Sequence, residues 1–432
     1  MPIRCAWVPD DNPLYVEYHT PGRIPLYRLI VSHLLSGLFA LTFITTALHA
    51  QQADSYVNVP FNLSLINKIS LGHALAKGKE QKIYNCGIAL GLISTKADKL
   101  RGVDISLGVS GYEESVRGVQ LGGLVAGAGN KGTGLQIGGL VGGCGNQFTG
   151  LQIGGLVSGC GNQFTGLQVG GLINGAGNNV NGLQLAGLIN GAGQSFTGAQ
   201  FAGIINGTGH SASGLQAAGI LNAVGQEFRG VQVAGLLNAV GRNFSGIQIS
   251  GFLNAAANVA QGVQIGLYNT SETNSGVPLG LVSKVESVGF AYDLFGDETR
   301  FVNIGLRSGT AVFYNLLSVG MRPGDPFSWS VGWGFGRNFK LAVGNQLDLG
   351  ISVAHINEGE FFTSRTNLLS KLQVMFIKKR AENLSLFAGP TLNLLLSRTG
   401  DGSWLAPWSI SDSKSGSLWK RVWPGVTAGV RF

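Results

Sequence analysis

The stretch GLQIGGLVSGCGNQFT, residues 150–165, is one copy of a tandem repeat, and GVQVAGLLNAVGRNFS, residues 230–245, is another. The Gly-Φ-Gln frame of this repeat, where Φ is an apolar residue, recurs every 16 residues without an insertion. Its Gly stands at positions 118, 134, 150, 166, 182, 198, 214, 230, 246 and 262. A fixed period of this length is typical of architectures in which each unit stacks on its neighbours.

Within one repeat, apolar residues flank the Gln on both sides, which is a period of two and predicts a short strand. A pair of small residues follows, then a second apolar pair such as Leu236-Leu237, and Asn, Gly and polar residues close the unit. No single repeat is long enough to bury its own apolar face. We therefore expect the apolar side chains to be buried by stacking.

Two arrangements of the strands satisfy this pattern. In a parallel β-solenoid each repeat is one coil, equivalent residues stack about 4.8 Å apart, and a constant period keeps the register. In one large antiparallel β-barrel each repeat is instead one strand and one turn. The pattern favours the solenoid, in which a structural ladder would form from Gln120, Gln136, Gln152, Gln168, Gln184, Gln200, Gln216, Gln232, Gln248 and Gln264. A second ladder would contain Asn174, Asn190, Asn206, Asn222, Asn238 and Asn254.

The first 50 residues predict an export signal. Arg23 and Arg28 precede an apolar run over residues 29–48, and Ala50-Gln51 fits a cleavage point. An uncleaved membrane anchor is the alternative. We expect four segments: a signal peptide at 1–50, an N-terminal β segment at 51–101, the repeat array at 102–284 and a C-terminal antiparallel barrel-like domain at 285–432.

The composition argues against catalysis on the array. Only 12% of the chain is charged, and residues 118–265 contain only four charged residues, Lys131, Glu227, Arg229 and Arg242. Acid–base chemistry would need clustered ionisable groups. No cofactor motif or metal-ligand spacing is present. The net charge of +8 is spread thinly, so we predict no nucleic-acid binding.

Two cysteines of the array, Cys144 and Cys160, occupy the same position in adjacent repeats. A solenoid would bring them within reach of a disulfide. The pattern favours two small buried residues, because other repeats carry Ala176, Ala192 or Val224 at this position.

The last third of the chain predicts an antiparallel sheet. Alternating segments of about 8–13 residues have the length of a tilted strand that crosses a bilayer. We expect strands at 300–307, 311–321, 328–337, 346–355, 368–377, 384–396 and 424–432. Six of the seven Trp lie in this region, and such rings favour a membrane–water interface.

The final strand alternates apolar Val426, Ala428, Val430 and Phe432 with Thr427, Gly429 and Arg431. An apolar outer wall around a polar lumen produces this pattern in a transmembrane barrel. A chain that ends on Phe in such a strand resembles the C-terminal signature of bacterial outer-membrane barrels, which the barrel-assembly machinery reads. The four apolar residues are the predicted membrane-strand terminus.

Over most of residues 56–432 the chain resembles the bacterial surface repeat-containing proteins. The resemblance rests on the Gly-Leu-Gln-Ile-Ala/Gly-Gly-Leu repeats, the exit segment GVQIGLYN…GVPLGLVS, and the later RFVNIGLRSGTAVFYN and AGVRF. It implies an exported protein of the outer membrane or cell surface. It transfers no enzyme activity, ligand or catalytic residue.

Three functions compete. The first is an outer-membrane or surface protein with a structural or adhesive repeat array and no catalysis. Its partners would be outer-membrane lipid, the barrel-assembly machinery and a surface ligand of unknown kind. The second is an outer-membrane channel or transporter whose repeats form barrel strands, and the third, least favoured, is a secreted solenoid enzyme.

Overall fold

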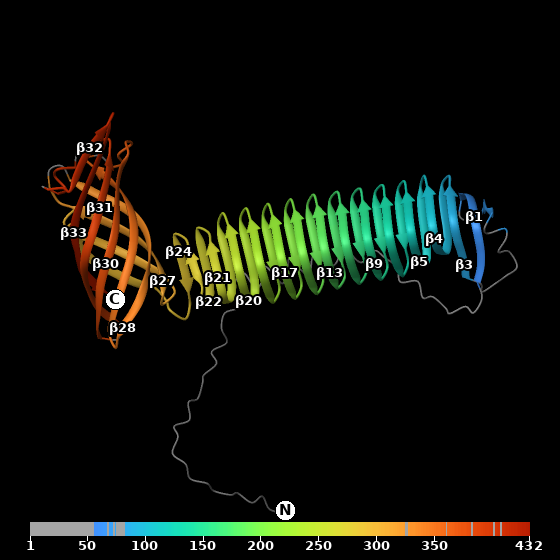
Figure 1. The fold of residues 1–432 in the computed structure, drawn as a ribbon, viewed down its shortest axis with the longest axis horizontal. Helices are drawn as coiled ribbons and strands as arrows, with labels where there is room; N and C mark the ends of the chain where they lie inside the picture. Colours follow the sequence, from blue (N-terminus) through green and yellow to red (C-terminus); the bar gives the residue numbers. More distant parts are fainter. Residues whose placement is uncertain are drawn as a thin grey trace, which may run out of the picture.

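We describe a computed structural model of the chain, covering residues 56–66, 69–71, 74, 83–324, 327–359, 361–381, 383–400, 402–406 and 408–432. The expected signal at 1–50 lies outside these residues. The fold is all-β and has two parts, a long parallel β-solenoid and an antiparallel sheet of nine strands (Figure 1). This confirms the predicted fold class.

Each central coil of the solenoid contains a long strand and a short strand. In the coil around Gln152 these are β9 (Gln147–Gly154) and β10 (Val157–Cys160), and the next coil repeats them as β11 (Gln163–Gly170) and β12 (Ile173–Ala176). The pairs β9–β11 and β10–β12 are parallel and offset by 16 residues. The alternative fold, one large antiparallel barrel that includes the repeats, is therefore wrong.

The remaining solenoid strands are β1 (Tyr56–Ile66), β2 (Ile69–Ser70), β3 (Ile83–Gly91), β4 (Ser94–Ser106), β5 (Val109–Gly122), β6 (Val125–Ala128), β7 (Lys131–Gly138), β8 (Val141–Cys144), β13 (Asn179–Ala186), β14 (Ile189–Ala192), β15 (Ser195–Ala202), β16 (Ile205–Thr208), β17 (Ser211–Ala218), β18 (Leu221–Val224), β19 (Glu227–Ala234), β20 (Leu237–Ser250), β21 (Leu253–Ile265), β22 (Tyr268–Asn274), β23 (Val277–Leu279) and β24 (Val282–Val285). The parallel pairs β1–β3, β3–β4 and β4–β5 carry the stack back to Tyr56. The coils before residue 102 thus continue the same sheet.

A glycine at the bend of each long strand explains why the Gly-Φ-Gln frame never loses its first residue. Gly150 has φ of 131°, a conformation that L side chains rarely adopt. A Cβ atom there would lie 2.1 Å from the carbonyl oxygen of Gly134 in the preceding coil. The coils approach so closely at this bend that only glycine fits.

The coil interior is mixed rather than apolar throughout. Phe148 and Phe164 stack in register with their ring centroids 5.9 Å apart, and Phe228 and Phe244 repeat the contact at 6.2 Å. These rings belong to one interior column, and small buried residues such as Cys144, Ala176 and Val224 form a second column beside it. Gln and Asn side chains fill the rest of the interior. The Leu and Ile residues that flank each Gln face outward, so the expectation that stacking buries them is wrong.

The second part is a closed antiparallel barrel. Its strands are β25 (Ala291–Asp297), β26 (Val302–Gly309), β27 (Phe313–Arg322), β28 (Ser328–Ala342), β29 (Asn345–Glu358), β30 (Asn367–Ala381), β31 (Leu384–Ser397), β32 (Ser411–Ser415) and β33 (Leu418–Arg431). Neighbouring strands pair in the order β25 to β31 and then β33, and β25 pairs with β33. Eight strands therefore close on themselves, and β32 extends β33 as a hairpin.

The two ends of the barrel differ. At one end, which we call the short-turn rim, only a few residues connect β26 to β27, β28 to β29 and β30 to β31, and Phe432 lies at this end. At the other end, the long-loop rim, residues 359–366 and 398–417 make the longer connections.

The last solenoid coil docks on the outer wall of the barrel, so that the solenoid projects sideways from it (Figure 1). Asn315 of β27 donates from Nδ2 to the carbonyl oxygen of Pro278 at 2.7 Å and accepts from the Gly280 amide at 3.1 Å. The indole of Trp333 donates to the Gly280 carbonyl oxygen at 2.8 Å. The Ser283 amide donates to Ser308 Oγ at 3.0 Å.

Candidate functional site: the internal ladders and the barrel lumen

The ten glutamines singled out in the sequence lie in one continuous column inside the solenoid. All are 0–1% exposed. From Gln136 onward, each Nε2 donates to the Oε1 of the Gln 16 residues earlier, at 2.7–2.9 Å. In several coils the same Nε2 also donates to a backbone carbonyl, as Gln152 does to Gly159 at 3.0 Å. The structure thus brings all ten together in one hydrogen-bonded ladder.

The second ladder has the opposite polarity. Asn174 donates from Nδ2 to Oδ1 of Asn190 at 2.9 Å, toward the C-terminal end of the array, and this pattern repeats as far as Asn269. Each Asn also donates to a backbone carbonyl across the coil, as Asn190 does to Phe201 at 2.7 Å. The dipoles of the two ladders therefore oppose each other within every coil that contains both.

A buried carboxylate occupies the ladder position one coil before Gln120. Asp104 is 0% exposed and accepts hydrogen bonds from the hydroxyls of Thr95, Ser106, Ser110 and Tyr112. Burial raises the pKa of the Tyr112 phenol well above its usual range, and the nearby Asp104 raises it further. Hydroxyl donors therefore surround the charge where the Gln column ends.

The cysteines of the array are free thiols. Cys144 and Cys160 are register partners in adjacent coils, and both are buried. Each Sγ–H donates at 3.0 Å to the backbone carbonyl three residues later, Cys144 to Gln147 and Cys160 to Gln163. Burial also raises the pKa of the Cys86 thiol to about 12. The Cys86 thiol, held in this protonated form, is a poor nucleophile.

Inside the barrel, near the short-turn rim, two carboxylates and two guanidinium groups form a closed network. Arg431 donates from Nε to Asp293 at 2.8 Å, and Arg307 Nη1 lies 2.8 Å from Asp348. The Arg307 guanidinium also contacts Asp293 and lies 3.8 Å above the Tyr314 ring. Tyr314 in turn donates to Asp348.

A second charged cluster lies closer to the long-loop rim. The Lys371 ammonium, only 1% exposed, lies 2.7 Å from Asp297. Asp297 also accepts from the backbone amides of Thr299 and Arg300, both at 2.8 Å. The Arg300 guanidinium donates to Ser330 at 2.7 Å. Every charge in this cluster has a partner of opposite sign.

Apolar side chains fill the lumen beside these clusters. One group contains Phe295, Met375, Ile377 and Phe387. At the long-loop rim, Ile356, Leu369, Leu395 and Trp423 pack against Leu405 and Ala406, two residues of the 398–417 connection. The interior is therefore packed with side chains, as an eight-stranded barrel permits.

The outer wall of the barrel is apolar. Side chains that alternate with the lumen residues point outward and are exposed, among them Tyr292, Leu294, Ile304, Val319, Leu349, Ile351, Val353, Leu372, Phe376 and Leu392. The last strand follows the same rule. Val426 and Phe432 are exposed, whereas Thr427 is buried and Arg431 reaches the lumen network.

The charged residues of the last third were given no role from the sequence, so the lumen network was missed. Asp348 lies inside β29 and is 1% exposed. The signal was available: Leu347, Leu349 and Ile351 alternate around it, which assigns Asp348 to the opposite face. Glu358 accepts from Asn367 at 2.6 Å, while His355 contacts the Thr363 carbonyl. His355 and Glu358 therefore bond to different partners.

In the described part of the chain, no three His, Cys, Asp or Glu side chains come together as a metal site would require. The described residues also include no helix long and apolar enough to cross a membrane. Searches against protein-family models, curated proteins and solved structures gave no match to this chain.

Proposed function

We propose that the chain is an exported bacterial outer-membrane protein, anchored by its barrel, with a structural or adhesive repeat array and no catalysis. The observation that carries the proposal is the inverted barrel: paired charges such as Lys371–Asp297 lie inside it, and side chains such as Ile351 and Phe376 lie outside. A barrel in water carries its charged side chains outside and its apolar side chains inside. A lipid-exposed barrel requires charged side chains inside and apolar side chains outside.

The dimensions of the barrel support the same reading. Strands β28 to β31 and β33 contain 14 or 15 residues each, more than the 9–11 or so that a tilted strand needs to cross the hydrocarbon. Short turns at one rim and longer loops at the other match the usual asymmetry of outer-membrane barrels. By that asymmetry, the short-turn rim faces the periplasm.

The packed lumen makes an anchor a better proposal than a channel. The channel reading also needed the repeats as barrel strands, and they form a separate parallel stack. We further propose that outer-membrane lipid contacts the outer wall and that the barrel-assembly machinery reads the strand ending in Phe432. These properties agree with those that the resemblance to surface repeat-containing proteins implies.

A pair of matched substitutions tests the lipid-facing wall. Ile351 lies in the middle of β29 and Ile410 beside the long-loop rim, and both are exposed, at 48% and 67%. A Lys at the bilayer midplane costs about 2–4 kcal/mol, but little near the interface. In a Gram-negative host, Ile351→Lys should sharply reduce the heat-modifiable barrel in the outer-membrane fraction, whereas Ile410→Lys should not.

A barrel in water would tolerate both substitutions equally, since each replaces an exposed Ile by Lys. Equal recovery of the two variants, or wild-type chain in the soluble fraction without detergent, would refute the proposal.

A further inference from the structure

The surface of the solenoid is divided lengthwise into an apolar part and a polar part. We number the repeat from its bend Gly as position 1. In nine successive coils, residues 118–261, positions 2, 4 and 7 hold only Leu, Ile, Val, Phe or Ala. We call these three columns the apolar ridge. Its seventh-position column contains Leu124, Leu140, Leu156, Leu172, Leu188, Ile204, Ile220, Leu236 and Phe252.

The ridge points away from the protein. Leu124 is 49% exposed and Phe252 57%, and no ridge residue of these coils is buried. With a strand spacing of about 4.8 Å and a rise of about 3.3 Å per residue, the five residue steps from position 2 to position 7, over nine coils, cover roughly 700 Å². Soluble monomers rarely expose a continuous apolar patch above a few hundred Å².

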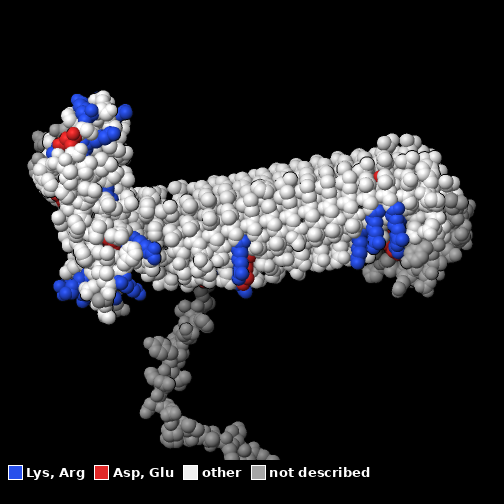
Figure 2. Space-filling model, viewed as in Figure 1, with Lys and Arg blue, Asp and Glu red and all other residues white. Residues whose placement is uncertain are grey.

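Polar and charged residues occupy the opposite edge. Positions 13, 14 and 16, which we call the polar strip, hold Asn, Gln, Thr and Ser in most coils, and Asn162 donates to Asn146 between coils at 3.0 Å. Lys131, Glu227, Arg229 and Arg242 all belong to this strip. Figure 2 shows the charges of the central coils along the lower edge of the solenoid, with an uncharged surface above them.

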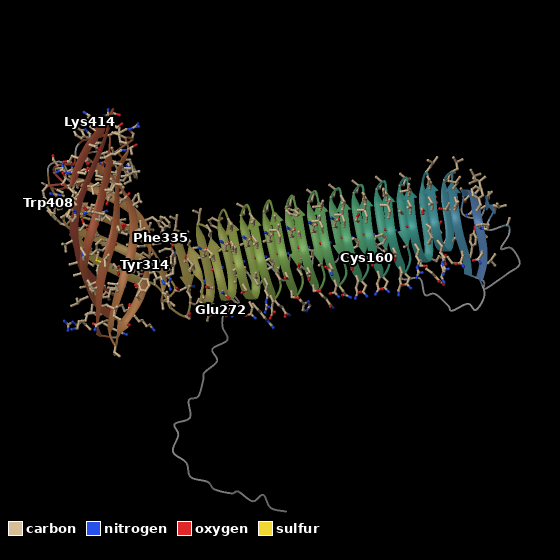
Figure 3. The ribbon with its side chains drawn as sticks, viewed as in Figure 1. Cys160, Glu272, Tyr314, Phe335, Trp408 and Lys414 are labelled. Carbon is tan, nitrogen blue, oxygen red and sulfur yellow. The ribbon has the colours of Figure 1, made fainter. Side chains whose placement is uncertain are left out.

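The polar strip faces the same direction as the short-turn rim of the barrel. Lys414, in the hairpin of the long-loop rim, lies at the top of the barrel in Figure 3, and Glu272 lies on the lower edge of the solenoid. Exposed Arg337, Lys340 and Lys378 lie near the short-turn rim. The charges of the central coils thus lie on the same side as the short-turn rim, whereas the barrel carries charges at both of its rims (Figure 2).

The docking contact places the solenoid against the wall of the barrel that we propose to be lipid-exposed. Ser308, Asn315 and Trp333 are outward-facing residues of β26, β27 and β28, and the last coil covers them. Exposed Leu267 and Leu281 extend the seventh-position column from Phe252 to the docking coil, so the apolar ridge runs up to the apolar outer wall of the barrel. Its backbone groups are paired with the coils on both sides, as a lipid environment demands.

We propose that the solenoid lies along the periplasmic leaflet of the outer membrane, with its apolar ridge among the acyl chains and its polar strip in water. The dimensions fit: the five residue steps from position 2 to position 7 span at most ~16 Å, close to half of the ~30 Å hydrocarbon core. The partner of the ridge is thus phospholipid. This inference rests on the proposed function, since the barrel sets the depth and direction of the solenoid.

Spin labels on the full-length chain in phosphatidylethanolamine–phosphatidylglycerol vesicles test the inference. The background carries Cys5→Ser, Cys86→Ala, Cys144→Ala and Cys160→Ala. Single cysteines then replace Leu156 or Leu188 on the ridge, Thr149 or Thr197 on the strip, and Ile351 on the barrel wall. Heat-modifiable migration first verifies that the barrel of each variant is folded. The experiment then compares how accessible each label is to oxygen, which partitions into lipid, and to a water-soluble nickel chelate.

Labels at both ridge positions should match the label at position 351, with oxygen favoured over the chelate, and both strip labels should show the reverse. If the label at 351 favours oxygen but the ridge labels favour the chelate, the solenoid stands clear of the membrane. The inference then fails while the proposed function survives. If the label at 351 also favours the chelate, the proposed function fails, and this inference fails with it.

Discussion

Replacing Gln184 by Leu interrupts the internal Gln ladder near its middle. The Gln184 side chain donates to Gln168 Oε1 and accepts from Gln200 Nε2, both at 2.7 Å. Leu has a similar volume but no polar atom, so Gln168 Oε1 and Gln200 Nε2 lose these partners while buried. Each such group costs about 1–3 kcal/mol. The free energy of unfolding should therefore fall by about 2–6 kcal/mol.

The adjacent double substitution gives the sharper result. Gln200→Leu alone leaves Gln184 Oε1 and Gln216 Nε2 without ladder partners, which is again two atoms. In Gln184→Leu/Gln200→Leu the atoms without ladder partners are Gln168 Oε1 and Gln216 Nε2, still two. The double variant should therefore lose about as much free energy as either single variant, and the two substitutions should be strongly non-additive.

A distant pair supplies the control. Gln136 and Gln232 lie six coils apart, about 29 Å at the usual strand spacing. Substitutions at such a distance without shared partners add. Guanidinium unfolding in detergent micelles, followed by circular dichroism, measures all the variants. Additive losses in the adjacent pair, or a loss below ~0.5 kcal/mol in Gln184→Leu, would refute the ladder argument.

Three further predictions concern other parts of the molecule. Gly166→Ala should destabilise the array by at least about 1–3 kcal/mol, because φ is 127° and the new Cβ would lie 2.1 Å from a carbonyl oxygen. The control is Gly159→Ala, whose new Cβ would have no neighbouring atom within 4 Å. It should be nearly neutral in the same unfolding assay. Lys371→Met should lower the thermal midpoint of the barrel by an amount equivalent to about 3–5 kcal/mol, because it removes the ammonium from buried Asp297; an unchanged midpoint would contradict the pairing. The stability of the solenoid should fall between about pH 9 and pH 12. Cys86 keeps its proton in the folded state up to a pKa of about 12, whereas the unfolded thiol loses it near its usual pKa of 9.0. Cys86→Ala should flatten this part of the pH profile.

The sequence predicted the repeat geometry well because a constant 16-residue period allows few arrangements. A single insertion would turn a strand over, so the unbroken frame at each Gly-Φ-Gln indicated in-register stacking. Periodicity of two also located seven of the barrel strands, but not β25 or β32. Five-residue β32 is fully exposed and polar, and it therefore carries no alternation that a sequence pattern could reveal.

The sequence did not indicate which face of the solenoid strand lies inside. Alternation separates Leu151 and Ile153 from Gln152, but it assigns neither set to the interior. The usual rule buries the apolar set, and here that rule is wrong because the amides bond to each other along the stack. The scarcity of charge across residues 118–265 was the one available hint, since a water-facing surface of this size normally carries many charges.

In the proposed membrane setting, both halves of the molecule solve the same physical problem. Lipid offers no hydrogen bonds, so amides and charges must find partners inside the protein, and apolar groups gain nothing by being buried there instead of in the bilayer. In the barrel the partners are ion pairs such as Lys371–Asp297, and in the solenoid they are two ladders of opposite polarity. The ladders explain why the period is constant through the central coils: moving one strand by a single residue would turn a Gln such as Gln184 toward the outside of the solenoid and leave its neighbours unpaired. A leucine core in water could repack after such a slip, whereas an amide ladder cannot.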